Sequence, residues 1–169
     1  MLNSLRPALL LLVLLLPACG FHPLYDPHSH SEAALATVQI SRLEDHTGQQ
    51  LNWLLQDRFY GGQAQGTPAW KLDIHLTTDK QELGIRRDSV ATRARLTLNA
   101  TFTLTPLTGQ GEPLRGSERS FVSYNIFTNP YATRTAEDNA TNRGMEELAD
   151  LVTNRIALYL AGQSGTKTP

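Results

Sequence analysis

The only cysteine in the chain, Cys19, lies where a thiol could be modified by lipid. It follows an apolar run at residues 8–16, and Leu16 and Ala18 stand three positions and one position before it. This spacing is that of the bacterial lipoprotein signal, in which the thiol forms a thioether with diacylglycerol before the preceding residues are removed. We therefore expect residues 1–18 to be a lipoprotein signal peptide and Cys19 to be lipidated.

The apolar run itself is too short to cross a membrane, because a spanning helix needs about 20 residues. Pro17 stands where Ala or Ser is commoner, so an unmodified cysteine beyond an ordinary cleavage site is the alternative interpretation. Lipidation would explain why an exported protein carries one unpaired thiol. Acyl chains, at about 0.8 kcal/mol for each buried CH2 group, would hold the protein on a membrane. Gly20 after the cysteine, in place of Asp, points to the outer membrane by analogy with lipoprotein sorting.

A second candidate site is rich in arginine. Arg86, Arg87, Arg93 and Arg95 lie in a ten-residue window with one acid, Asp88. Guanidinium groups bind phosphate and carboxylate through two parallel hydrogen bonds. The four arginines are therefore candidate ligands for an anionic lipid head group. The alternative interpretation is that these arginines belong to a solvated hairpin, or that they pair with Asp88 and with the acidic C-terminal helix.

Sequence patterns for catalysis are missing. The chain has no Gly-x-Ser-x-Gly, no Gly-rich phosphate loop before a helix and no His-Glu-x-x-His. Glu146 and Glu147 belong to a charged helix surface. Asp26, His28 and His30 could offer metal ligands, but a solvated linker is the preferred interpretation because no second cluster follows. We expect a non-enzymatic protein without a metal or cofactor.

Charge and length limit the function further. The chain has 15 Lys and Arg against 16 Asp and Glu, a formal net charge of −1, and Arg6 is the only charged residue before Cys19. This balance does not indicate binding to nucleic acid. Residues 19–169 have the usual length of one domain. Within them we expect a lipidated tether at 19–34, an α+β domain at 35–162 and a flexible tail at 163–169.

Alternation of apolar and polar residues predicts the strands. A short strand is expected at 37–41 and a half-buried strand at 70–77, with His75 on its polar, exposed face. The longest alternation, at 93–104, puts one set of residues on the buried face: Ala94, Leu96, Leu98, Ala100, Phe102 and Leu104. Its threonine-rich other face suggests an antiparallel sheet with one wet side. After a turn at 106–111, a further strand is expected at 119–127.

Two helices are expected. Thr47 and Gln50 have the spacing of a capping box before an apolar stripe, and Gly61 and Gly62 can end that helix. Asn129 before Pro130 predicts the start of a longer helix that ends near Gly162. The fold class expected is α+β, a four-stranded mostly antiparallel sheet with two helices packed on one face.

Three segments carry a resemblance to a known family. Cys-Gly-Phe-His-Pro-Leu-Tyr at residues 19–25, Ser-Tyr-Asn at 123–125 and Asn-Pro-Tyr at 129–131 resemble the lipopolysaccharide-assembly lipoprotein family LptE. The order of the predicted elements agrees along nearly the whole chain. The resemblance implies a domain that sits inside the outer-membrane β-barrel LptD, supports it and binds lipopolysaccharide. The family's lipopolysaccharide-binding residues are not placed by motif, so the four arginines come from the charge pattern alone.

The leading functional hypothesis follows from this resemblance. It is a lipid-anchored outer-membrane lipoprotein, facing the periplasm or the barrel lumen, that assembles with and plugs an LptD-like barrel and binds lipopolysaccharide during export. The alternative is an envelope lipoprotein that binds a small molecule or a polymer independently of a barrel. An envelope hydrolase would need a catalytic site that the sequence does not offer.

Overall fold

The computed structural model describes residues 30–43, 45–62, 64–85, 91–109 and 111–165. Cys19, the signal peptide and residues 166–169 therefore lie outside the described residues. The elements follow in the order helix, strand, helix, three strands and helix: α2 (His30–Leu35), β1 (Val38–Ile40), α3 (His46–Tyr60), β2 (Trp70–Ile85), β3 (Ala91–Pro106), β4 (Leu114–Asn125) and α4 (Pro130–Gly165).

The strands form one sheet in the order β1-β2-β3-β4. Strands β2, β3 and β4 pair antiparallel, but β1 pairs parallel with β2, so that Val38 lies beside Trp70 and Ile40 beside Leu72. The sheet is thus mixed, and the expectation of a mostly antiparallel sheet was wrong. The physical reason is the intervening α3, because the connection through this helix returns the chain to the end from which β1 began.

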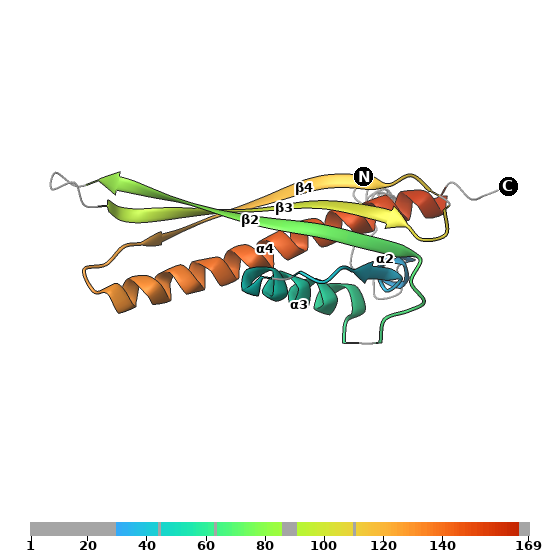
Figure 1. Ribbon diagram of the computed structural model, residues 1–169, viewed down its shortest axis with the longest axis horizontal. Helices are drawn as coiled ribbons and strands as arrows, with labels where there is room; N and C mark the ends of the chain where they lie inside the picture. The colour runs from blue at the N-terminus through green and yellow to red at the C-terminus, as the bar shows by residue number, and fades with distance from the viewer. Residues whose placement is uncertain (1–29, 44, 63, 86–90, 110, 166–169) are drawn as a thin grey trace, which may run out of the picture.

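The helices lie on one face of the sheet (Figure 1). Helix α4 has 36 residues, about 54 Å at roughly 1.5 Å per residue, and β3 has 16 residues, about 54 Å at roughly 3.4 Å per residue. One helix therefore runs the length of the sheet, with α3 beside it. The described helices on this face number three, one more than expected, because α2 packs at one end against α3 and α4.

The core lies between this helix layer and the long strands. The whole alternating set predicted for β3 is buried, with Leu98, Ala100 and Leu104 at 0% exposure. Buried side chains of α3 and α4 pack against this set of β3 residues: Leu51, Leu55, Met145, Leu148, Val152 and Ile156. The predicted orientation of β3 is therefore confirmed.

The start of α3 differs from the prediction. The N-cap is Asp45, whose carboxylate accepts a hydrogen bond of 3.0 Å from the backbone N–H of Gly48, and Thr47 lies inside the first turn. A carboxylate caps at least as well as a threonine hydroxyl and also favours the positive end of the helix dipole. The end of α3 agrees with the prediction, because Gly61 adopts a left-handed conformation with φ of 56°.

Helix α4 starts as predicted, since the Asn129 side chain accepts a 2.9 Å hydrogen bond from the backbone N–H of Tyr131. Its end was placed too early, because α4 continues through Gly162 to Gly165. A glycine inside a helix costs only about 1 kcal/mol. The packing of Tyr159 against Trp70, with ring centroids 5.9 Å apart, holds this end of α4 on the sheet.

Three other segments, α2, β2 and β4, differ from the sequence-based prediction. Helix α2 begins within the segment expected to be an irregular tether. Strand β2 continues well past residue 77, where the side chains no longer alternate in polarity, because backbone pairing with β3 extends to Ile85. Strand β4 likewise begins at Leu114, before the predicted position.

Over the residues described, none of the helices has the length and apolar character needed to cross a membrane.

Candidate functional surface on the open face of the sheet

None of the helices that the structure describes lies on the sheet face opposite α3 and α4 (Figure 1). We call it the open face. It is formed by the odd-numbered residues of β2, β3 and β4 from Lys71 to Asn125, most of which are exposed. The end near the β2–β3 hairpin turn is called distal, and the end near β1 is called basal. Because side chains alternate across a strand, every second residue of three long strands reaches this surface.

Arg93 and Arg95 of β3 lie exposed on the open face at its distal end, on the same side of the strand as predicted. The register places Arg93 beside Asn125 of β4, and Arg95 between Gln81 of β2 and Ser123 of β4. Of the predicted group, these two are brought together.

The other predicted members, Arg86 and Arg87, lie outside the described residues, as does Asp88. Their part in the site stays a prediction.

The acidic helix cannot neutralise these two arginines, because α4 covers the other face of the sheet (Figure 1). Its carboxylates pair with other cations: Glu137 with Lys80 at 3.0 Å, Asp138 with Arg134 at 3.1 Å and Asp150 with Arg58 at 2.5 Å. Arg93 and Arg95 form no salt bridge with any residue that the structure describes. The alternative in which the helix pairs with them is therefore wrong.

The register between β3 and β4 brings two further arginines to the open face, which were not predicted from the sequence. Arg115 and Arg119 of β4 are exposed on the open face, beside Thr103 and Asn99 of β3. Neither forms a salt bridge within the described part of the chain. The period of two from Arg115 through Arg119 was available in the sequence, but the strand was expected to start only at residue 119. The open face thus carries a line of four arginines along its length.

An exposed aromatic residue interrupts this line. Phe121 of β4 is 59% exposed, and the Arg119 guanidinium carbon lies 5.9 Å from the centre of its ring. A cation at this distance from a ring face is attracted to the ring, although an exposed contact of this kind contributes only about 0.5–1 kcal/mol. The register puts Phe121 beside Thr97, one row from Arg95. The distal half of the open face therefore combines positive charge with apolar surface.

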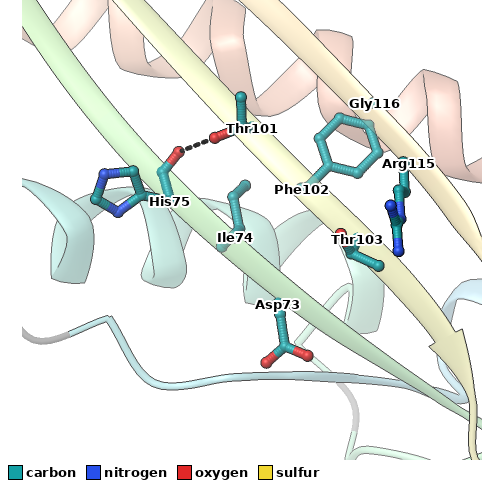
Figure 2. Close-up of a pocket in the computed structure, with 8 residues that line it drawn as sticks. All are labelled: Asp73, Ile74, His75, Thr101, Phe102, Thr103, Arg115 and Gly116. Atoms are coloured by element: carbon teal, nitrogen blue, oxygen red, sulfur yellow. Dashed lines mark hydrogen bonds between the residues drawn. The ribbon is translucent and has the colours of Figure 1, made fainter.

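The basal half contains a shallow cavity of about 430 Å³ (Figure 2). Its polar side chains come from all three strands in two adjacent rows of the register, and Ile74, Phe102 and Gly116 complete the lining: Asp73, His75, Thr101, Thr103 and Arg115. The Thr101 hydroxyl donates to the backbone carbonyl of His75 at 3.4 Å. Gly116 is required here, because a Cβ at this position would lie 2.5 Å from the Phe102 ring.

Asp73 is held as a carboxylate in this cavity. It accepts hydrogen bonds from the Ser41 hydroxyl at 2.6 Å and from Lys71 at 2.9 Å. The Ser41 hydrogen bond first, and the hydrogen bond and charge of Lys71 next, lower the pKa of Asp73 below its ordinary value. The cavity therefore offers a fixed acceptor, hydroxyl groups, an imidazole and one guanidinium.

The cavity does not resemble a metal centre. Across the residues that are described, no three His, Cys, Asp or Glu side chains gather as metal ligands would. His75 is exposed on the polar face of β2, as the alternation predicts. The polar groups of the open face are suited to holding an anionic, hydroxyl-rich ligand by hydrogen bonds.

Solved structures share this fold. A crystal structure of a protein classed as a lipoprotein from Caulobacter crescentus CB15 superposes with a TM-score of 0.60 at 26% identity and covers 80% of this chain and 98% of its own. The rare lipoprotein B of Shewanella oneidensis superposes with a TM-score of 0.59 at 10% identity and covers 76% and 97%. No match was found among curated protein sequences. The architecture is thus one that solved lipoproteins have.

The sequence defines the family more narrowly. The profile of LptE, the lipopolysaccharide-assembly family, matches residues 35–156, which include β1 to β4, α3 and most of α4. The chain therefore belongs to the LptE family. This membership, with the lipoprotein folds above, supports a lipopolysaccharide-assembly lipoprotein of the cell envelope.

Proposed function

We propose that this protein is a lipid-anchored outer-membrane subunit that forms a one-to-one complex with an LptD-like β-barrel and binds lipopolysaccharide during its export. Its role in this proposal is assembly and binding without catalysis. Membership of the LptE family supports the partnership with the barrel. Lipidation at Cys19 would keep the domain at the membrane.

The observation that carries the binding proposal is the state of the open-face arginines. Arg93, Arg95 and Arg119 are exposed, share one face and have no acidic partner among the described residues. Phe121 lies among them. Lipopolysaccharide offers phosphate groups and acyl chains close together, which a surface of guanidinium groups and an aromatic ring complements.

A pull-down from detergent-solubilised envelopes tests the partnership. The full chain should recover a large β-barrel protein in equal amount, and bound lipopolysaccharide should be recovered with it. Recovery of the lipoprotein alone would instead favour an envelope lipoprotein that binds a small molecule or polymer without a barrel.

The variant Arg93→Ser/Arg95→Ser separates the two activities in the same experiment. It should keep the barrel and lose much of the lipopolysaccharide. The matched control is Arg143→Ser/Arg155→Ser, which removes the same charge from exposed positions of α4 and should recover both.

A further inference from the structure

The basal cavity and the distal arginines lie on one continuous surface but do not form one site. The row of Arg95 and the row of Arg115 are about 27 Å apart along the strands, at roughly 3.4 Å per residue. Between them lie the row of Arg119 and Asn99 and the polar side chain of Ser117, whose hydroxyl donates to Asn99 at 2.9 Å. A ligand that meets both ends must therefore be elongated.

The two ends differ in chemistry. Around Arg95 and Arg119 the surface includes the exposed ring of Phe121, so a ligand there can place apolar groups beside its anionic groups. In the basal cavity the fully exposed side chains are polar, Ile74 is half-buried, and Phe102 turns its ring into the core at 4% exposure. The distal end therefore suits a phosphorylated lipid, and the basal end suits a more hydrophilic group.

The hydrogen-bond donors and acceptors that line the basal cavity limit which class of hydrophilic group can bind there. Arg115 provides the fork that binds phosphate or carboxylate in two hydrogen bonds. Asp73 already accepts at Oδ1 from Ser41 and Lys71, and its Oδ2 is left as an acceptor for hydroxyl groups. Thr103 can donate and accept, whereas the Thr101 hydroxyl donates to the His75 carbonyl and is left as an acceptor. A small acidic sugar satisfies all of these, since its charged group can lie at Arg115 and its hydroxyl groups at Asp73. The volume of about 430 Å³ lies within the usual range for small-molecule sites, roughly 300–1,000 Å³.

We propose that the basal cavity is a second binding subsite, which takes a phosphorylated or otherwise acidic sugar of a glycan whose lipid-bearing end lies at the distal arginines. This inference rests on the proposed function, because the glycan is that of lipopolysaccharide. It assigns a direction to the bound ligand: lipid toward the β2–β3 hairpin and sugar toward β1. Arg115 holds the acidic group, and Asp73 accepts hydrogen bonds from the sugar hydroxyl groups.

The test compares ligands that contain one or both ends. The full-length protein in detergent is titrated with lipid A alone, with lipopolysaccharide that carries a phosphorylated core, and with the released phosphorylated core oligosaccharide. Arg115→Ser should weaken binding of the complete lipopolysaccharide and of the oligosaccharide by about three- to tenfold. Its affinity for lipid A should be unchanged. Arg95→Ser should weaken lipid A, and Arg155→Ser, a matched loss of charge on α4, should change none of the three.

The outcomes separate this inference from the proposed function. An Arg115→Ser variant that binds the core oligosaccharide and the complete lipopolysaccharide as the wild type does would overturn the basal subsite. Equal weakening of lipid A and complete lipopolysaccharide would also overturn it, because the effect would then be one of general charge. If the wild type failed to bind lipid A, the proposed function would be wrong, while oligosaccharide binding that depends on Arg115 would still support the basal subsite.

Discussion

Gly144 of α4 should be a position at which alanine destabilises the protein, although alanine is the better helix former. A Cβ at Gly144 would lie 2.4 Å from Cδ1 of Leu98 and 3.2 Å from Cγ2 of Val122. Leu98 is fully buried, so its methyl group has little space into which to move. Replacing a helical glycine gains up to about 1 kcal/mol, whereas forcing a methyl group into a packed core costs about 1–3 kcal/mol. Gly144→Ala should therefore lower the stability by up to about 2 kcal/mol.

Thermal unfolding followed by circular dichroism measures this effect. For a chain of this size each kcal/mol shifts the Tm by about 2–4 °C, so the expected loss is up to about 8 °C. The control is Gly162→Ala in the same helix, where a Cβ would meet no atom within 4 Å and the Tm should rise slightly. A Gly144→Ala variant as stable as Gly162→Ala would refute the close approach of α4 to β3.

A second substitution isolates the contact itself. Leu98→Ala should cost about 2–5 kcal/mol, because it leaves a cavity between the sheet and α4. In that background Gly144→Ala should be stabilising, since its methyl group enters the space that the leucine leaves. A double-mutant cycle without such a reversal would show that the two positions are not coupled.

Three further changes test the anchor, a helix cap and an ion pair. Cys19→Ala should abolish labelling by fatty acid and leave the protein in the periplasmic fraction or as an uncleaved precursor; labelling that persisted would exclude Cys19 as the anchor. Asn129→Ala should cost about 1 kcal/mol in chemical denaturation, because the first turn of α4 loses its cap, while Thr128→Ala should be near neutral. Burial alone would raise the pKa of Glu137, but the hydrogen bond and charge of Lys80, together with the neighbouring Tyr124 hydroxyl and Arg134, outweigh it and lower that pKa below its ordinary value. The stabilisation is then present above the unfolded pKa and lost as the pH falls through the folded pKa, so Glu137→Gln should lower the Tm at pH 7 and have little effect near pH 3; an equal loss at both values would contradict this assignment.

Much of the fold could be predicted because its largest elements bury one face along their whole length. The alternation in β3 specifies which side chains enter the core, and all of the predicted set are buried. Two signals that depend only on adjacent residues were also correct: Asn129 predicted the start of α4, and Gly61 predicted the end of α3. Where the pattern is local and repeated, a single sequence is sufficient to define it.

The differences arise where pairing between distant segments decides the structure. The parallel pairing of β1 with β2 depends on where α3 returns the chain, which no local pattern states. The polar part of β2 beyond Thr77 is a strand because β3 pairs with it, and its own side chains would not predict this. The basic surface was underestimated for the same reason, since Arg115 and Arg119 join Arg93 and Arg95 only through the register between β3 and β4.

In the proposed function, lipopolysaccharide binds to the open face through arginines that form no salt bridge within the described residues. The most direct measurement is the affinity of full-length protein for lipopolysaccharide, compared between Arg93→Ser/Arg95→Ser/Arg119→Ser and the charge-matched control Arg42→Ser/Arg143→Ser/Arg155→Ser. All six positions are exposed, and none forms a salt bridge within the described residues. We predict that the open-face variant loses about tenfold or more in affinity, with its Tm and barrel complex retained, and that the control stays close to the wild type. Equal loss in the two variants, or no loss in the first, would contradict the claim.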